Sequence, residues 1–522
     1  MTRTQNSFFN AATSLGSTVL VVVLGFIART VFVRTLGVSY QGIEGEFTNV
    51  LSVLSLADLG ISSAIVFKLY KPIEEQDRHR VLVLMKLFRQ LYWIIGGVIV
   101  LFGLCLIPLL PHLAADYELF GQLGLNPVLI FLIYLFHTAS SYWVFAYKSS
   151  FVRANQKGYL LSTAGYVIAA VNYMSQIGAL RFFHSYMLYI IIQWVFTVVT
   201  GIVGAIICNR RYPWINDRVR DRVSREELKE FFKDCGAVFL NRVHNVIINS
   251  SDYIVLTAVV GLWAGGLYTN YLYVKNNLRS LLDSVINAFD ASIGSVYSTG
   301  NLEWAHLIFR VVNFVVFWLY GVGAIALAVL LNEFIPLWLG SRDFVITSWI
   351  HDGTAYATPL ALLVGVEFYI IGYRQYFMIF REAMGLFQHM KFRPIASVLV
   401  NLIFCVPGVW LFGPAGCVAS TIIAGLTTNL IFDPIVIYKH ALKTSVKPYF
   451  LRNLLYAAVV AAAGLLTAWV CGHIPLGGIP GFLVRGCVCV GLPSAVFALC
   501  FFRSEEFRYL LNTAGQLLHR KS

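Results

Sequence analysis

Long apolar stretches recur from one end of the chain to the other and are separated by short polar segments. Runs of about 18 or more apolar residues are typical of helices that cross a bilayer. We therefore predict an all-α polytopic membrane protein with about fourteen transmembrane helices. They are expected at residues 10–34, 42–68, 82–110, 127–148, 159–180, 185–208, 236–259, 266–297, 305–331, 355–376, 392–412, 415–438, 451–471 and 481–502.

The longest polar segment falls between the sixth and seventh predicted helices and divides the first twelve into two groups of six. Within it, Ser224 and Glu227 have the spacing of a capping box, so we expect a short amphipathic helix that leads into helix seven. The predicted domains are an N-terminal six-helix lobe at 1–208, a cytoplasmic linker at 209–235, a C-terminal six-helix lobe at 236–438, and two extra transmembrane helices with a cytoplasmic tail at 439–522.

A faint internal repeat supports this division into two halves. Gly37 and Gly42 lie in the predicted turn between helices one and two. Gly261 and Gly266 occur 224 positions later, between helices seven and eight. An even number of helices in each half indicates parallel repeats, related by an axis along the membrane normal.

Basic residues alternate along the chain in a way that predicts its orientation. The two ends and every second loop hold 28 of the 39 Lys and Arg residues, whereas the opposite loops hold only Arg181 and Arg342. By the positive-inside rule, both termini of this multi-pass protein are expected in the cytoplasm, on the inner face of the cell membrane. The formal net charge of +13 is then mainly explained by the basic residues that set the membrane orientation, and no nucleic-acid partner is expected.

Several functional classes are disfavoured by the motifs of the chain. The nine cysteines lie mostly in apolar runs without zinc-binding spacing, so no metal site is expected. The chain lacks a Walker A glycine loop and room for a nucleotide domain, which excludes ATP-driven transport within it. No catalytic arrangement occurs in a sizeable outer loop, so we predict no enzyme and no cofactor. Energy for transport would come from a proton or sodium gradient or from the membrane potential.

Charged residues inside the predicted helices are the candidates for function, because each costs about 2.5–3.5 kcal/mol at the helix centre. Arg34 lies near the outer end of the first helix, where snorkelling or a pair with Glu44 or Glu46 explains it. Arg29 lies more than a turn deeper. For Arg29 a salt bridge and an aqueous cavity are equally good interpretations.

A charged stripe runs along the eighth predicted helix. Lys275, Arg279 and Asp283 are spaced i, i+4, i+8, so they share one face, and such a face lies against protein or water. Arg279 is expected to bridge to Asp283, which leaves Lys275 charged. A cavity with excess positive charge should bind an anion, and the planar fork of arginine suits phosphates. The candidate substrate-binding residues are Arg29, Arg34, Arg242, Lys275 and Arg279.

Acidic residues inside the predicted helices have two interpretations. Each is either a salt-bridge partner, which we favour, or a proton or sodium site that couples transport to a gradient. These residues are Asp58, Asp252, Asp283, Asp290 and Glu367.

Three segments of the chain resemble bacterial lipid-linked oligosaccharide flippases of the multidrug/oligosaccharidyl-lipid/polysaccharide exporter superfamily. They are TLGVSYQGIEGEFTNVLSVLSLADLGISSAIVFKLYKPIEEQD, VFAYKSSFVRANQKGY and NSSDYIVLTAVVGLWAGGLYTNYLYV. The resemblance covers essentially the whole chain. It implies two six-helix lobes around a central cationic cavity, whose arginines hold the pyrophosphate of an undecaprenyl-pyrophosphate-linked glycan.

The activity that this resemblance implies is translocation of the glycan lipid from the inner to the outer leaflet by alternating access. It would serve cell-surface polysaccharide biosynthesis, such as capsule or exopolysaccharide assembly. The implied partners are membrane lipids, a polysaccharide polymerase and glycosyltransferases.

Alternatives to this function remain. The two C-terminal helices resemble the extra pair of peptidoglycan-precursor flippases, so a lipid II-type flippase is the alternative within the superfamily. A membrane glycan polymerase or ligase is the alternative from another class, but such enzymes need a large outer loop, and the longest here is residues 332–354. A drug exporter of the same superfamily should have an acidic cavity, whereas basic residues outnumber acids in helices one, seven and eight combined.

Overall fold

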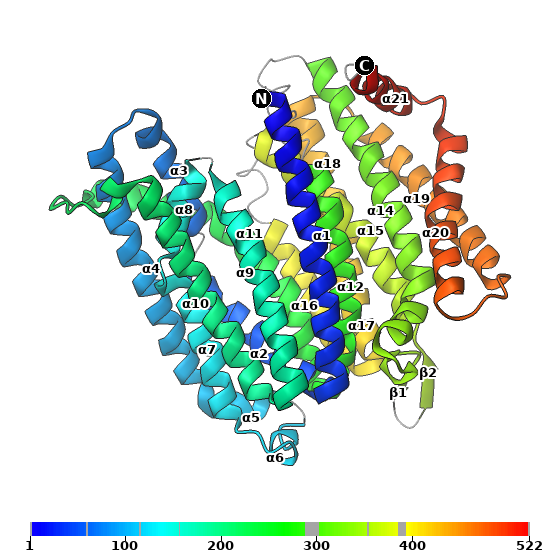
Figure 1. Ribbon diagram of the computed structural model, residues 1–522. Helices are drawn as coiled ribbons and strands as arrows, with labels where there is room; N and C mark the ends of the chain where they lie inside the picture. The colour runs from blue at the N-terminus through cyan, green and yellow to red at the C-terminus, as the bar shows by residue number, and fades with distance from the viewer. Residues whose placement is uncertain are drawn as a thin grey trace. The chain divides into compact units, whose positions relative to one another are not determined.

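The computed structural model describes residues 3–58, 61–113, 116–155, 157–287, 302–351, 354–384 and 393–519. Nearly all of them are helical (Figure 1). In the first half of the chain the helices are α1 (Arg3–Leu36), α2 (Val38–Leu54), α3 (Ile61–Glu74), α4 (Arg78–Leu106), α5 (Leu110–Leu113), α6 (Leu119–Gln122), α7 (Pro127–Trp143), α8 (Ala146–Ala154), α9 (Gly158–Gly178), α10 (Tyr186–Arg211) and α11 (Arg225–Val260).

The second half has the same character, with one short antiparallel hairpin made of β1 (Ser348–His351) and β2 (Thr354–Ala357). Its helices are α12 (Leu262–Asn287), α14 (Leu302–Leu339), α15 (Leu360–Ala383), α16 (Arg393–Phe412), α17 (Pro414–Ala424), α18 (Leu430–Ile437), α19 (Lys447–Gly472), α20 (Gly478–Phe501) and α21 (Glu505–His519).

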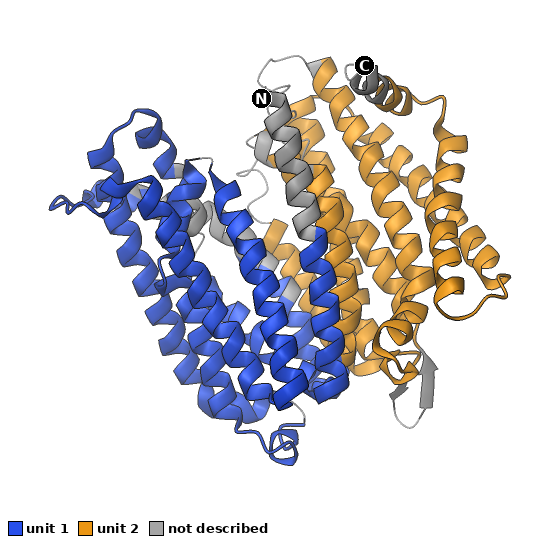
Figure 2. Ribbon diagram, viewed as in Figure 1, with its two compact units in different colours: residues 1–266 blue, residues 267–522 orange. Residues whose placement is uncertain are grey.

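The helices form two compact units, residues 1–266 and 267–522 (Figure 2). The division falls in the first turn of α12, and α11 belongs to the first unit. There the Tyr253 hydroxyl of α11 donates to the Gly42 carbonyl of α2 at 2.9 Å. The boundary between the two units does not fall at the polar segment between the sixth and seventh predicted helices. The six-helix lobes therefore remain a prediction.

Every predicted span coincides, at least in part, with helical residues. Among the described residues, eight helices are long and apolar enough to cross a membrane, and the bent pair α7–α8 adds a ninth. Within the span predicted at 42–68, α2 ends at Leu54, a 3-10 helix covers Ser55–Asp58, and α3 begins at Ile61. The all-α polytopic fold class is therefore confirmed.

The predicted capping box begins α11. The Ser224 side chain accepts from the Glu227 amide at 3.2 Å, and the Glu227 carboxylate accepts from the Ser224 amide at 3.1 Å. This second hydrogen bond lowers the pKa of Glu227. The expectation of a separate short helix is wrong, since α11 continues unbroken to Val260. No proline interrupts that stretch of sequence, and a lone glycine is tolerated within a helix.

The repeat predicted from glycine spacing corresponds to two similar helix junctions. Gly37 separates α1 from α2, and Gly261 separates α11 from α12. Their φ angles are 94° and 115°, a region that glycine enters at little cost because it has no Cβ. Both junctions consequently pass from one helix to the next through a single residue.

The second glycine of each repeat allows α2 to cross closely over the start of α12. A Cβ at Gly42 would collide with the carbonyl oxygen of Leu262, and a Cβ at Gly266 would collide with that of Val38. Val38 and Leu262, like Gly42 and Gly266, are 224 positions apart. The contact is therefore reciprocal. The offset found in the sequence relates the residues that meet at the starts of the two helices.

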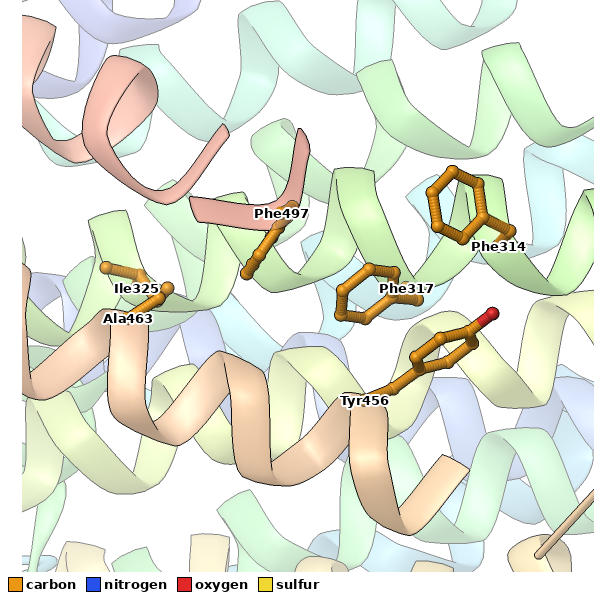
Figure 3. Packing of buried hydrophobic residues seen from close by; sticks show 6 residues of the cluster. All are labelled: Phe314, Phe317, Ile325, Tyr456, Ala463 and Phe497. Carbon is orange, nitrogen blue, oxygen red and sulfur yellow. The ribbon is translucent and has the colours of Figure 1, made fainter. Parts of the chain in front are cut away.

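The two C-terminal helices pack onto α14 within the second unit (Figure 3). The Phe317 ring of α14 stacks on Tyr456 of α19, with ring centroids 4.2 Å apart, and lies 4.7 Å from Phe497 of α20. Aromatic pairs of this kind add about 0.5–1.5 kcal/mol to the burial of their surface. The helices predicted at 451–471 and 481–502 are thus joined to the unit through an aromatic core.

Replacing Gly42 by alanine tests the reciprocal crossing. The added Cβ must push α2 away from α12, and overpacking of this kind costs about 1–3 kcal/mol. We expect Gly42→Ala to lower the thermal unfolding midpoint of the protein purified in detergent. The control is Gly97→Ala on α4, where a Cβ meets nothing within 4 Å, and its midpoint should stay or rise. Equal midpoints for the two variants would contradict the crossing.

Candidate functional site

Arg29, the deeper of the two predicted arginines of α1, is held by an ion pair. Its Nη1 lies 3.0 Å from Oε2 of Glu44 on α2, and the two side chains are 11% and 16% exposed. The other oxygen of Glu44 accepts from Tyr189 and Gln193 of α10 at 3.3 and 3.2 Å. Of the two interpretations of Arg29, the salt bridge is the one that the structure contains.

The acids expected to pair with Arg34 have other partners. Glu44 binds Arg29, and the buried Glu46 accepts a hydrogen bond from Thr257 of α11. The turn at Gly37 explains why Arg29 pairs with Glu44. Arg29 and Glu44 are eight and seven residues from it, so they face each other across the two helices. Arg34 itself is exposed.

Lys275 of α12 forms a buried ion pair with Glu367 of α15. Its Nζ donates to both carboxylate oxygens, at 2.7 and 2.8 Å, and the side chains are 6% and 7% exposed. The expectation that Lys275 keeps an uncompensated charge is therefore wrong. Its partner lies 92 positions further along the chain. The spacing of charged residues along α12 could not identify a partner on another helix.

The predicted bridge between Arg279 and Asp283 is confirmed. The Arg279 Nε lies 3.2 Å from the Asp283 carboxylate, one turn along α12. The other oxygen of Asp283 accepts from the Tyr320 hydroxyl of α14. Asp283 is therefore a structural partner for two neighbours.

The remaining predicted residues lie apart from these pairs. Asp58 is fully buried in the short helix that follows α2, and Asp252 is 8% exposed in α11. The side chain of Arg242 and the whole of Asp290 lie outside the described residues.

Three arginines in or between the spans predicted at 355–376 and 392–412 belong to helices, although Arg381 was expected beyond the end of its span. Arg374 and Arg381 lie in α15, and Arg393 begins α16. Arg381 and Arg393 are only 5% and 8% exposed. The predicted end of the helix at 376 is wrong, because the next proline or glycine is Gly385 and nothing earlier stops it. The lack of a breaker was the signal that could have placed Arg381 in this helix.

The arginines of α12, α15 and α16 form one electrostatic group. Arg374 interacts with Arg279, Arg381 and Arg393 and with Asp433 of α18. Arg393 donates to Asp433 at 2.8 Å and to the Asn429 side chain at 2.7 Å. We call Arg279, Arg374, Arg381 and Arg393 the arginine cluster.

Among the described residues around the arginine cluster, guanidinium groups outnumber carboxylates. Asp283 binds Arg279 and Asp433 binds Arg393, so among the groups described in its surroundings two carboxylates face four guanidinium groups. Guanidinium groups present a planar fork of donors that matches phosphate oxygens. The arginine cluster can therefore bind a di-anionic phosphate group.

An apolar groove, with a volume of about 890 Å³, lies between α14, α15 and α19 of the same unit. Small residues form part of its lining, among them Ala328 of α14, Gly365 of α15 and Gly464 of α19. Gly365 and Tyr369 line the groove, and Arg374 follows on the same helix. Helix α15 thus carries part of an apolar wall and part of a cationic group.

Arg485 of α20 lines the groove, and its positive charge is compensated. Its guanidinium pairs with Glu333 of α14 and donates to the carbonyl groups of Ile474 and Leu476 at 2.9 and 3.1 Å. Arg485 thereby fastens the turn between α19 and α20. The groove is consequently apolar apart from one neutral ion pair.

The Lys275–Glu367 pair predicts a non-additive effect of mutation. Removing one partner strands the other charge in the protein interior, which costs about 3–5 kcal/mol. We expect Lys275→Met and Glu367→Met each to lower the unfolding midpoint in detergent strongly, and the double variant to be more stable than either. Additive losses in this double-mutant cycle would show that the pair is not coupled.

Comparison with other proteins finds a matching family model and a similar membrane protein. The family model described as polysaccharide biosynthesis protein matches residues 8–290. The uncharacterized membrane protein EpsK of Bacillus subtilis (strain 168) is 24% identical over 328 residues, which are 60% of this chain and 60% of the relative.

Two solved structures share the fold at low identity. The lipid II flippase MurJ, in an inward closed conformation, has a TM-score of 0.61 at 14% identity, over 94% of this chain and 99% of that one. An outward-facing multidrug resistance MATE family transporter of the MOP superfamily has a TM-score of 0.52 at 12% identity, over 82% and 96%. Because the family model covers more than half of the chain, the protein belongs to the polysaccharide biosynthesis protein family.

Proposed function

We propose that this protein is a flippase for a polyprenyl-pyrophosphate-linked oligosaccharide. It would move this lipid from the inner to the outer leaflet by alternating access, for cell-surface polysaccharide biosynthesis. The single observation that supports the proposal most is that α15 contributes to both the arginine cluster and the apolar groove. An amphiphile with a phosphate head and a long apolar chain has the chemistry that matches this helix.

The phosphate end of the substrate is assigned to the arginine cluster. A pyrophosphate carries at least two negative charges, and several guanidinium groups act together around Arg374 to offset them. An interior site of low polarity makes this attraction stronger than it would be in water. Arg29 and Lys275 are weaker candidates than the sequence suggested, because Glu44 and Glu367 already neutralise them.

The polyprenyl chain is assigned to the apolar groove. Each CH₂ group removed from water contributes about 0.8 kcal/mol, but a groove open to lipid gains mainly packing contacts and shape selection. Its floor of small residues on α14, α15 and α19 accommodates a branched chain without displacing side chains.

The competing functions fit these features less well. A cationic drug would be repelled by the excess positive charge of the arginine cluster. A glycan polymerase or ligase would need catalytic residues in a sizeable outer loop, whereas the segment between α14 and α15 is taken up by a short hairpin. A lipid II-type flippase has the same head and tail chemistry, and only the glycan distinguishes it.

Arginine substitutions test the proposal directly. Purified protein in liposomes is given an undecaprenyl-pyrophosphate-linked oligosaccharide with a fluorophore on the glycan, and translocation is followed by a quencher that cannot cross the membrane. We expect Arg374→Gln/Arg381→Gln to lower the rate at least about tenfold, since each charge-assisted hydrogen bond contributes about 1.5–3 kcal/mol.

The matched control is Arg218→Gln/Arg220→Gln, which removes two charges from the exposed segment before α11 and should keep the wild-type rate. Wild-type rates in the cluster variant, with an unchanged unfolding midpoint, would refute the assignment of the phosphate. No translocation by the wild-type protein would refute the flippase itself.

Filling the groove tests the assignment of the tail. Ala461 of α19 lines the groove, whereas its exposed neighbour Ala462 does not. We expect Ala461→Phe to slow translocation of a 55-carbon lipid and to leave a 10-carbon analogue unaffected, because only the long chain needs the groove. Ala462→Phe should leave both rates unchanged. Equal slowing of the two lipids by Ala461→Phe would contradict a role in holding the tail.

A further inference from the structure

The first unit contains a second cavity, of about 690 Å³, at the place where the α7–α8 span is broken. Helix α7 ends at Trp143, α8 begins at Ala146, and the two are bent by 44°. Between them Phe145 has a φ of 57°. Irregular backbone at membrane depth is tolerated where it lines protein or a water-filled cavity. Transporters build substrate sites on such broken helices.

Two glycines of α10 hold the break against this helix. A Cβ at Gly201 would collide with the Val144 carbonyl oxygen, and a Cβ at Gly204 would lie 2.5 Å from the Ser149 hydroxyl. Larger residues would move α10 away from the break and change the cavity. The cavity is therefore set by close backbone packing and does not result from a missing side chain.

Hydroxyl groups supply most of the polar lining of this cavity. Ser141 and Thr200 donate to carbonyl groups of their own helices at 2.7 and 2.8 Å, whereas Ser140 donates at 2.6 Å and also accepts from the Trp194 indole at 2.8 Å. A hydroxyl that donates in this way presents its remaining lone pairs as acceptors. The lining is consequently rich in acceptors, which favours a ligand with several donor groups.

The charges of the cavity offset each other. Among its described lining residues, Asp58 supplies one carboxylate, fully buried, and Arg153 supplies one guanidinium. A site for an anion or a cation would need an excess of one sign. Tyr92 and Tyr142, with ring centroids 6.3 Å apart, add aromatic surface beside the hydroxyl groups. Aromatic faces and hydroxyl acceptors together suit a neutral pyranose ring, which has both apolar C–H faces and hydroxyl donors.

We propose that this cavity binds a neutral sugar residue of the transported glycan. The inference rests on the proposed function and assigns recognition of the glycan to the first unit, while the second unit takes the phosphate and the lipid chain. The volume lies within the range of about 300–1,000 Å³ typical of small-molecule sites. Selectivity among glycans then depends on the hydroxyl groups of α7 and α10.

The test compares two lipids on the full-length protein in nanodiscs. One probe is undecaprenyl pyrophosphate carrying a disaccharide of neutral hexoses, and the other is undecaprenyl pyrophosphate without sugar. We expect Ser141→Ala/Thr200→Val to weaken binding of the glycan lipid about tenfold, through the loss of two hydrogen bonds. Binding of the sugar-free lipid should be unchanged. Each single variant, Ser141→Ala or Thr200→Val, should show part of the same selective effect.

The control is Thr163→Val on α9. Like Thr200, Thr163 is exposed and donates to a carbonyl of its own helix, that of Tyr159 at 2.9 Å, but it does not line the cavity. Wild-type affinity for the glycan lipid in the cavity variants would overturn the sugar site and leave the flippase proposal standing. Equal weakening of both lipids would also overturn it, since the cavity would then act through the fold. Failure of the wild-type protein to bind either lipid would refute the proposed function.

Discussion

A charged side chain without a partner is costly inside a bilayer, and the helices of this protein are joined where such charges meet. Each pair links two helices, or two turns of one helix, and so positions them as well as neutralising them. The pairs decide which positive charge is left over for a substrate. The pairs among the described residues include Arg29–Glu44, Lys275–Glu367, Arg279–Asp283, Arg393–Asp433 and Arg485–Glu333.

Local interruptions of the helices work together with these pairs. The junctions at Gly37 and Gly261 let the chain turn within one residue, and the glycines that follow them let α2 and α12 approach until backbone meets backbone. At the α7–α8 break, Gly201 likewise allows a close backbone contact, and a polar cavity lies there. Small residues of α14, α15 and α19 form part of the lining of an apolar groove instead.

Features that depend on neighbours along the chain were predictable. The helices follow from apolar runs, the α11 cap from the spacing of Ser224 and Glu227, and the Arg279–Asp283 bridge from the i, i+4 rule. Contacts between distant segments were not. The partner of Lys275 comes from another helix, and the burial of Arg381 depends on how far α15 extends. A run of sequence contains no information about which helix faces it.

The sequence by itself determined the class of this protein, its helices, the repeat offset and the excess of basic residues, because hydrophobic periodicity and glycine spacing are local properties of a chain. Only the tertiary structure decided which of those basic residues are neutralised. For the proposed phosphate site, it moved the strongest candidates from Arg29 of α1 and Lys275 of α12 to the arginine cluster of the second unit. The reason is that a charge is compensated through space, by whichever acid the packing of helices brings within a few ångströms.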